Sequence, residues 1–382
     1  MKTYNGILVI FHCHENTGYA IKTLEDRFYL VAKLLAGTNI HFSFTELDDT
    51  PRQSNNKKPI SVLRFDPCTT DKKELLELSQ YIQKYKIDCV LGFDQPPGRP
   101  YYKYIRKAGV KYIVSYWGAS MSSINRGAKL LLKKIEILLR RYSPDHYIFE
   151  SKAMQDSAIY GRGIPANKTS ITYLGVDTEK YKPGSDDNLY PYITFKIPEN
   201  RKILFYSGHM EQRKGVNILI KAAIELADKR NIKNFHFLIL GNKNGEESIY
   251  NEMLESTTAA DHVTFGGYRE DIPSILPACY LGVIASTGWD SFTMSSLEMA
   301  SAGLPLLVSA LQGLRETVSD GITGFCFQPG NHMELADKIE MFLTNENIRK
   351  KMSLKSRERI CSGFTIENQV SSLTQTIRAL DR

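Results

Sequence analysis

Residues 205–216 read Phe-Tyr-Ser-Gly-His-Met-Glu-Gln-Arg-Lys-Gly-Val and mark the change from an apolar strand to an amphipathic helix. The strand ends at a glycine, and a short loop then carries Arg213 and Lys214 ahead of the helix. Unpaired amides and the helix dipole attract anions to a helix N-terminus, and the two basic side chains add formal charge. The stretch therefore predicts an anion site, with a basic pair on a solvated turn as the alternative.

The same alternation of short apolar strands and helical patterns continues outward along the whole chain. Strands without polar alternation, joined by helices, indicate parallel sheets that are covered on both faces. Residues 180–200 lack a periodic pattern and contain several prolines, so they separate two halves. The predicted fold class is α/β, with two doubly wound Rossmann-like domains at 1–182 and 183–364 that face each other across a cleft.

The predicted elements follow from this alternation. Strands are expected at 6–13, 39–46, 60–65, 89–93, 111–116, 146–149, 203–207, 236–240, 263–265, 281–285, 304–308 and 325–327. Helices are expected at 18–36, 70–84, 99–108, 126–141, 151–160, 215–230, 246–257, 292–302 and 331–343. Ligands of such sheets bind beyond the carboxyl ends of the strands, so the site is sought in the loops that follow them.

Residues 287–300 form a second informative segment, which follows an apolar strand and opens the next helix. Asp290 lies at the loop-to-helix junction, and Glu298 lies about 12 Å further along at the helical rise of ~1.5 Å per residue. One carboxylate can meet a group beyond the helix end, and the other can meet a group beside the helix body. The alternative is that Asp290 is an ordinary N-cap and Glu298 a surface residue.

Further motifs appear in a fixed order around this segment. Glu-Met-Ala at 298–300 precedes Gly-Leu-Pro at 303–305, and Gly-Val-Asp-Thr occupies 175–178. Gly-Leu-Arg-Glu-Thr-Val at 313–318 and Asp-Gly-Ile-Thr-Gly-Phe at 320–325 complete the series. The series resembles family 4 of the retaining glycosyltransferases, the group 1 glycosyltransferases of GT-B fold. The resemblance also implies that a C-terminal helix, 365–382, packs back on the first domain.

The resemblance assigns roles to individual positions. Lys214 and Asp290 are the expected catalytic residues: Lys214 contacts the donor diphosphate and Asp290 faces the transferred sugar. Glu298 is expected to bind the ribose hydroxyls, and the amides around 292–295 to meet phosphate or sugar oxygens. Gly18, in the loop after the first strand, matches the family's glycine that approaches the phosphate. The full donor-binding set is Gly18, Gly208, His209, Arg213, Lys214, Phe292, Thr293, Met294, Ser295 and Glu298.

Several positions depart from the family pattern. The first acid is Asp290 where Glu is usual, and Thr293 replaces a glycine and narrows its loop. His209 replaces the usual Arg after the strand-end glycine, so either His209 or Arg213 takes the phosphate role. A Trp-Gly pair stands at 117–118 where His-Asp is frequent in the family. The candidates for contact with the sugar or acceptor are His12, His14 and Trp117, although a lone histidine is more often structural.

The chemistry follows from the charges that develop during transfer. Cleavage of the sugar–phosphate bond builds negative charge on the diphosphate and oxocarbenium character on the sugar. Lys214, Arg213 and a helix N-terminus can stabilise the first, and Asp290 can offset the second. The resemblance implies same-face attack with retention, so no nucleophilic side chain is nominated. The chain has no Asp-x-Asp motif, so no metal requirement and no cofactor are expected, the nucleotide sugar being a co-substrate.

Composition and cysteine usage are those of a soluble cytoplasmic protein. Apolar residues make up 42% of the chain and charged residues 24%, and no apolar run reaches the ~20 residues of a membrane span. The N-terminus lacks a signal-peptide pattern. The six cysteines are scattered without Cys-x-x-Cys spacing, which indicates reduced thiols.

The net charge of +7 is concentrated in the first half, where residues 1–182 carry +10 and residues 183–382 carry −3. Residues 99–141 alone hold 11 basic residues and one acid, Glu136. Tyrosines interleaved with lysines at 101–107 suit the headgroup layer of an anionic membrane, where each basic residue adds ~1 kcal/mol. The alternative is an ordinary surface helix at 126–141 that packs Leu131, Ile135 and Leu138 inward. Nucleic acid is not an expected partner, because no such motif accompanies the charge.

The predicted function is a retaining glycosyltransferase that works in cell-surface polysaccharide biosynthesis. It moves a hexose or N-acetylhexosamine from a nucleotide diphosphate sugar, with uridine the family's commoner base, to a saccharide or lipid-linked saccharide. The expected location is cytoplasmic and peripheral, on the inner face of the cell membrane. Two alternatives stay open: a soluble transferase acting on a small metabolite or sugar phosphate, and a catalytically silent nucleotide-sugar-binding protein.

Overall fold

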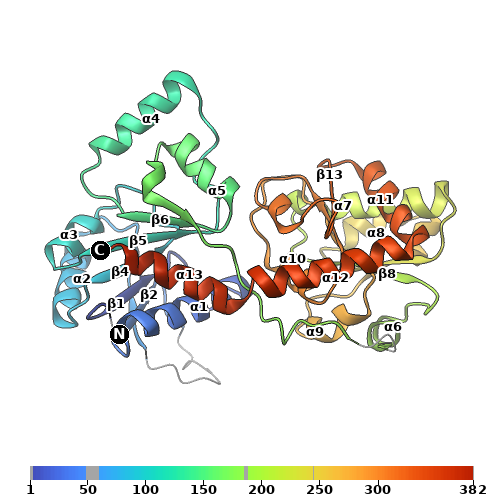
Figure 1. The fold of residues 1–382 in the computed structure, drawn as a ribbon, viewed down its shortest axis with the longest axis horizontal. Helices are drawn as coiled ribbons and strands as arrows, with labels where there is room; N and C mark the ends of the chain where they lie inside the picture. Colours follow the sequence, from blue (N-terminus) through green and yellow to red (C-terminus); the bar gives the residue numbers. More distant parts are fainter. Residues whose placement is uncertain (1–2, 49–59, 185–187, 244, 382) are drawn as a thin grey trace. The chain divides into compact units, whose positions relative to one another are not determined.

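The computed structural model describes residues 3–48, 60–184, 188–243 and 245–381. The chain forms two compact units, the first made of residues 1–173 and 366–382 and the second of residues 174–365. The sequence places the division after residue 182, within the segment that opens the second unit. Each unit contains one parallel sheet with helices on both faces (Figure 1). The predicted fold class of two Rossmann-like α/β domains is confirmed.

Within its described residues, the first unit has a seven-stranded sheet in the order β3-β2-β1-β4-β5-β6-β7. All the neighbouring strands in this sheet run parallel. The strands are β1 (Ile7–Ile10), β2 (Ile40–Phe44), β3 (Ser61–Arg64), β4 (Cys89–Phe93), β5 (Tyr112–Trp117), β6 (His146–Phe149) and β7 (Thr169–Ile171). The order reverses between β1 and β4, which makes their carboxyl ends the switch point where doubly wound sheets bind ligands.

Helices cover both faces of this first sheet, which explains why its central strands are fully buried. Phe28 of α1 packs against Phe11 and Tyr116 on one face. Side chains of α2 and α3 pack against Leu8 and Ile10 on the other. The helices are α1 (Tyr19–Ala36), α2 (Lys72–Lys84), α3 (Tyr101–Lys107), α4 (Gly127–Leu139), α5 (Lys152–Asp156) and α13 (Ile366–Ala379), with a π-helical turn at Ser157–Arg162.

The C-terminal helix α13 belongs to the first unit and lies beside α1 (Figure 1). Its Leu373 and Ile377 are buried. The Tyr4 hydroxyl donates a hydrogen bond of 2.8 Å to the carbonyl of Ile377, and the hydroxyls of Thr172 and Ser372 lie 3.0 Å apart. Both apolar burial and polar contacts therefore hold the end of the chain on the first sheet.

Within its described residues, the second unit has a six-stranded parallel sheet in the order β10-β9-β8-β11-β12-β13, so its switch point lies between β8 and β11. One face is covered by α7, α8 and α11, whose side chains join one large core cluster. The strands are β8 (Lys202–Ser207), β9 (Phe235–Leu240), β10 (Val263–Phe265), β11 (Leu281–Ile284), β12 (Leu306–Ser309) and β13 (Gly324–Phe327). The helices are α6 (Tyr190–Phe195), α7 (Val216–Ile224), α8 (Ser248–Leu254), α9 (Ile272–Ile275), α10 (Met294–Ser301), α11 (His332–Thr344) and α12 (Glu346–Gly363).

In the basic segment 99–141 the structure corrects one detail of each sequence-based interpretation, and membrane association itself stays a prediction. Tyr101 and Tyr102 are buried in the core under the sheet, so these aromatic rings are not available to a headgroup layer. Leu131, Ile135 and Leu138 are exposed, so the expectation that they pack inward is also wrong. In the described parts of the chain, no helix is long and apolar enough to cross a membrane.

Candidate functional site

The position of Lys214 is set by the glycine that follows it. Gly215 has φ of 71° and is the N-cap of α7, and a Cβ built on it would lie 1.8 Å from the carbonyl oxygen of Ala285. Only glycine allows this loop to approach the end of β11 so closely. The Lys-Gly pair therefore brings the Lys214 side chain from the end of β8 to the loop after β11, across the switch point.

Lys214 and Asp290 form a largely buried ion pair at this switch point. The Lys214 Nζ donates to both carboxylate oxygens of Asp290, at 3.0 and 3.1 Å. The hydroxyl of Ser286, itself fully buried, donates to the same carboxylate at 2.6 Å. A charge-assisted pair with a third partner holds both groups in one geometry. The two residues that the resemblance assigns to catalysis are thus in direct contact.

Asp290 is not the N-cap of the following helix, so that alternative interpretation is wrong. Helix α10 begins at Met294, and its N-cap is Thr293. The backbone amide of Asp290 instead donates to the side-chain oxygen of Gln312, at 3.1 Å, in the loop after β12. Three neighbouring strand ends of the sheet therefore contribute contacts to Asp290.

Glu298 is buried in α10, with 7% of its surface exposed, so the interpretation as a surface residue is also wrong. Its helix starts with Met294 and Ser295, whose amides belong to the first turn. The side chain of Ser296 donates to the carbonyl of Thr293, at 2.6 Å, and fixes that turn. Asp290 and Glu298 thus lie before and within one short helix, as their spacing indicates.

Arg213 is engaged by its own loop. Its Nε lies 2.7 Å from the Glu211 carboxylate, and its guanidinium stacks over the Trp289 ring at 5.1 Å. Its carbonyl accepts the amides of Thr287, at 2.7 Å, and Gly288, at 3.2 Å. These contacts tie the Arg-Lys-Gly turn to residues 287–289. His209, by contrast, is exposed directly after Gly208, and its carbonyl accepts a 2.9 Å hydrogen bond from Tyr206.

Two other expected donor-binding residues have evident structural tasks. Phe292 is buried, and its ring stacks on Phe364 with ring centroids 5.5 Å apart. Gly208 donates its amide to the carbonyl of Leu240, at 3.1 Å, and a Cβ there would lie 2.8 Å from the Tyr206 hydroxyl. Both residues shape the carboxyl edge of the sheet. At each of them the backbone, rather than the side chain, is the part that suits contact with a ligand.

The expected residues of the first unit lie near its own switch point. Gly18 begins α1 with φ of 123°, and no atom lies within 4 Å of a Cβ built on it, so the start of this helix is open. His12 follows β1, and its Nδ1 lies 3.1 Å from the carbonyl of Phe93. His14 lies 3.3 Å from the carboxylate of Glu46 and is mostly exposed. Of the two histidines, His12 contacts β4 across the switch point, and His14 contacts the residue that follows β2 by two positions.

Trp117 lies at the end of β5 and packs in a core cluster with Tyr147, Phe149 and Met154. Its ring is 8% exposed, and its Nε1 lacks a hydrogen-bond partner among the described residues. This burial gives Trp117 a packing role. Its contact with an acceptor or sugar stays a prediction.

Asp94, which the sequence patterns missed, is a carboxyl with a perturbed pKa at this edge. It follows β4 with a positive φ of 50° and accepts the amide of Gly118 at 3.0 Å. Burial raises its pKa to about 6, while the hydrogen bond from Gly118 and the charge of His12 oppose the rise. Glu150, buried after β6, lies close enough that a Cβ on Gly118 would be 3.1 Å from it. The sequence signal for this site was a single acidic residue, Asp94, directly after a strand that ends at the switch point.

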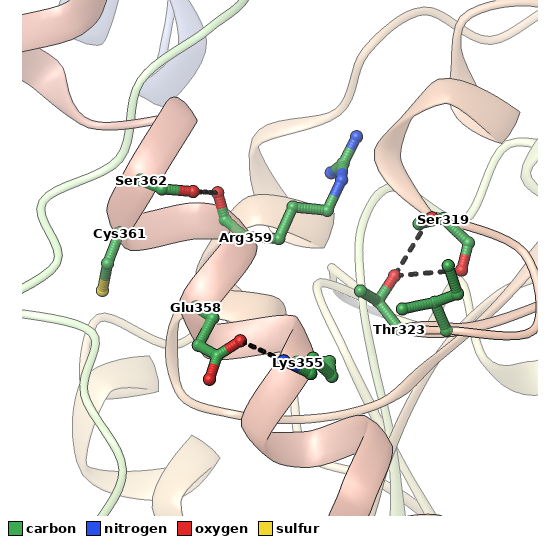
Figure 2. Close-up of a pocket in the computed structure, with 8 residues that line it drawn as sticks. Ser319, Thr323, Lys355, Glu358, Arg359, Cys361 and Ser362 are labelled. Atoms are coloured by element: carbon green, nitrogen blue, oxygen red, sulfur yellow. Dashed lines mark hydrogen bonds and ion pairs between the residues drawn. The ribbon is translucent and has the colours of Figure 1, made fainter.

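A cavity of about 680 Å³ opens elsewhere in the second unit, between α12 and the loop that precedes β13. Figure 2 shows that several of its polar groups pair with one another. Lys355 contacts Glu358 at 2.7 Å, and the Ser319 amide donates to the Thr323 hydroxyl at 2.9 Å. None of the expected site residues lines it. Across the described ranges, no group of three His, Cys, Asp or Glu side chains is arranged to hold a metal ion.

Solved structures of known proteins share this architecture. A glycosyltransferase from Rickettsia africae matches with a TM-score of 0.82 and 17% identity, over 99% of this chain and all of that one. HepE from Anabaena in complex with UDP matches with a TM-score of 0.78 and 18% identity, over 98% of this chain and 100% of that one. Two parallel-sheet Rossmann-like domains of this kind define the GT-B class of fold.

Sequence comparison identifies the family to which the second unit is similar. The family described as Glycosyl transferases group 1 matches residues 194–359, which include Lys214, Asp290 and Glu298. A UDP-Gal:alpha-D-GlcNAc-diphosphoundecaprenol alpha-1,3-galactosyltransferase from Escherichia coli is 24% identical over 79% of this chain and 78% of its own length. Several other curated relatives are matched over only about half of their length. Residues 194–359 therefore form a group 1 glycosyltransferase domain, and the glycosyltransferase relatives support a transferase enzyme.

Proposed function

We propose that this transferase moves a hexose or N-acetylhexosamine from a uridine diphosphate sugar to a lipid-linked saccharide, with retention of configuration. The observation that supports the donor assignment is the Lys214–Asp290 ion pair at the switch point of the second sheet. A hydrogen bond from Ser286 to Asp290 holds this pair in place. The UDP bound to HepE and the UDP-Gal donor in the name of the Escherichia coli relative support uridine. That name also supports an acceptor linked to a lipid diphosphate.

Charge placement explains how the second unit would promote departure of the diphosphate. Lys214 supplies a fixed cation, and the start of α10 supplies amides that point toward an anion. Asp290 then lies beside the cation, on the side where the sugar gains positive character. In the free enzyme the negative charge of Asp290 neutralises the positive charge of Lys214. The site therefore needs no bound anion to hold the ammonium group in place.

The phosphate contact that the family assigns to an arginine would fall to His209. Arg213 is already paired with Glu211 and stacked on Trp289, so its task is to hold residues 287–289 against the Lys-Gly turn. His209 is exposed directly after the strand-end glycine. The imidazole can donate a hydrogen bond to a phosphate oxygen in either protonation state.

The first unit would bind the acceptor by hydrogen bonds to the acceptor's sugar hydroxyl groups. Asp94, Glu150 and His12 lie around the carboxyl ends of β1, β4 and β6, and such side chains accept and donate hydrogen bonds to sugar hydroxyls. No side-chain nucleophile is required if the leaving diphosphate takes the proton of the attacking hydroxyl on the same face. A lipid-linked acceptor also makes the anionic inner surface of the cell membrane a partner of the enzyme.

A transfer assay tests this proposal. The purified chain is incubated with UDP-, GDP- and ADP-sugars and a short prenyl-diphosphate-linked N-acetylglucosamine, and products are followed by mass spectrometry. We expect transfer from a UDP-sugar and, by NMR, the anomeric configuration of the donor in the product. Transfer from GDP- or ADP-sugars alone would contradict the uridine assignment, and an inverted anomer would contradict retention.

A further inference from the structure

Helix α4 is unusual because it buries none of its 13 residues. In Figure 1 it stands apart from the sheet at the outer edge of the first unit. Five large apolar side chains on it are exposed, namely Leu131 (59%), Leu132 (67%), Ile135 (44%), Leu138 (77%) and Leu139 (79%). Single exposed leucines are common on soluble proteins, but a group of five on one helix marks an interaction surface.

These five side chains form one continuous stripe. Leu131, Ile135 and Leu138 follow the spacing i, i+4, i+7, and Leu132 and Leu139 form an adjacent row seven residues apart. At 3.6 residues per turn the five positions span about 120° of the helix circumference. We call these five residues the α4 stripe. Its width is that of an apolar face which would normally cover a core.

The opposite side of α4 attaches it to the domain through charges. Glu136 accepts hydrogen bonds from Lys133 at 2.9 Å, Arg140 at 2.7 Å and Arg162 at 2.9 Å, the last from the neighbouring π-helical turn. Hydrogen bonds from Arg140 and Lys133 lower the pKa of Glu136 to about 2, so it stays ionised at any physiological pH. In this cluster Glu136 lies beside the row of Leu132 and Leu139, and Lys133 and Arg140 lie farther round the helix, away from the stripe.

Close backbone contact fixes the same orientation. A Cβ built on Gly163, where φ is 83°, would lie 2.7 Å from the backbone nitrogen of Lys134, so only glycine allows this approach. Arg140 also donates to the carbonyl of Pro97 at 3.2 Å, and the partly buried Ile137 packs on the Trp117 cluster. The helix is thus held by polar and glycine contacts that point the stripe outward.

Basic side chains flank the stripe. Lys134 borders the stripe on the helix, Arg126 and Arg141 are exposed at the two ends of the helix, and Lys129 is exposed beside Glu136, the single acid of the segment, which is paired. An apolar face with a basic border is the composition of helices that lie in the interface of anionic membranes. Two copies of the stripe brought together would oppose like charges, which disfavours a second copy as the occupant.

We infer that α4 is an interfacial helix that inserts the α4 stripe into an anionic lipid surface while its basic border contacts headgroups. The helix follows β5, whose carboxyl end lies at the edge of the sheet to which we assign the acceptor. Insertion would therefore keep this edge close to lipid-linked saccharides. The role of this insertion in bringing the enzyme to its acceptor rests on the proposed function. Lipid binding by α4 does not rest on it, because binding requires neither donor nor acceptor.

Vesicle co-sedimentation without donor or acceptor tests the inference. The chain is mixed with phosphatidylcholine vesicles that contain or lack one third phosphatidylglycerol. We expect binding to the anionic vesicles, weakened by salt, and a loss of at least about tenfold in affinity for the Leu131→Gln/Leu138→Gln variant. The Lys129→Glu/Lys134→Glu variant should lose about fivefold per charge.

Matched variants keep the test specific. Leu76→Gln/Leu354→Gln alters leucines that are 54% and 69% exposed on α2 and α12, and it should bind vesicles as the wild type does. Lys72→Glu/Lys350→Glu is the corresponding charge control, also on α2 and α12. Wild-type circular dichroism and an unchanged thermal unfolding transition would show that the stripe variants fold.

Two outcomes would overturn the inference. One is equal vesicle binding by the wild type and the Leu131→Gln/Leu138→Gln variant, or no binding by either. The other is a wild-type dimer in sedimentation velocity that the same variant converts to a monomer, which would make the α4 stripe an interface between copies of the chain. Either result would leave the proposed transfer reaction intact.

Discussion

The carboxyl edges of the two sheets have the same topology and opposite electrostatic character. At the edge of the second sheet a lysine and an aspartate are already paired, and a buried serine donates to the aspartate. At the edge of the first sheet two acids, the partly buried Asp94 and the buried Glu150, lie near one histidine, and desolvation raises the pKa of Asp94. The edge of the second sheet suits a ligand with a diphosphate. The edge of the first sheet suits a neutral ligand rich in hydroxyl groups.

The difference arises from local sequence rather than from the fold. The second edge depends on a Lys-Gly turn that enters the switch point, because Gly215 tolerates contact with Ala285. The first edge has no corresponding basic turn: its loop after β1 carries His12 and His14 and reaches Gly18 at the start of α1. One short turn therefore decides which of two similar sheets can hold an anion.

The largest effect is expected at Asp290. Asp290→Asn keeps the size of the side chain and removes the charge beside the developing positive sugar, so transfer should fall by about 100- to 1000-fold. The readout is the turnover number with saturating UDP-sugar. Asp337→Asn, which changes an exposed acid paired with Arg230, is the control and should keep wild-type turnover. Comparable turnover in both variants would remove Asp290 from the catalytic site.

The next effect concerns the pH dependence of stability through Asp94. Its folded-state pKa of about 6 exceeds the ordinary value of 3.8, so the neutral carboxyl stabilises the folded chain, and that contribution is lost as pH rises through about 6. Asp94→Asn cannot lose it. As the pH rises from about 4 to about 6, the variant should gain stability relative to the wild type, by roughly 3 kcal/mol at most. Urea unfolding at several pH values measures it, and parallel profiles would show that Asp94 titrates normally.

A smaller effect is expected at Ser286, which we treat as a positioning residue. Ser286→Ala removes the 2.6 Å hydrogen bond to Asp290 and should lower turnover about fivefold while leaving UDP affinity unchanged. Ser309→Ala is a matched control, because Ser309 is equally buried at the end of β12 and its hydroxyl has no partner among the described residues. If Ser309→Ala has the same effect, the loss reflects packing rather than orientation of Asp290.

Much of the fold could be predicted because it is encoded in apolar periodicity. The strands and the main amphipathic helices follow that pattern, and the structure places them within a few residues of expectation. Helix α12 was missed although it has 18 residues, because only Met352, Ser356 and Ile360 are buried and no apolar stripe results. The three-residue edge strand β7 was missed because it is too short to show alternation.

The candidate site was predictable only in part. Motif order identifies Lys214, Asp290 and Glu298, but sequence patterns do not state that the first two are in contact. Ser286 and Gln312 escaped notice because each meets Asp290 only through the folded loops. The orientation of α4 was likewise hidden, because a stripe of leucines predicts burial unless polar contacts on the other face fix the helix the opposite way.

The most direct test of the central claim, that the edge with Lys214 holds the donor diphosphate, is the affinity for UDP measured by isothermal titration calorimetry. We predict that the wild type binds UDP and that Lys214→Met binds about tenfold to 100-fold more weakly, because it loses a charge-assisted hydrogen bond. Lys221→Met, on the exposed side of α7, should bind as the wild type does. The Lys214→Met/Asp290→Asn variant keeps the test valid if an unpaired Asp290 destabilises the single variant. Wild-type UDP affinity in a folded Lys214→Met variant would contradict the account.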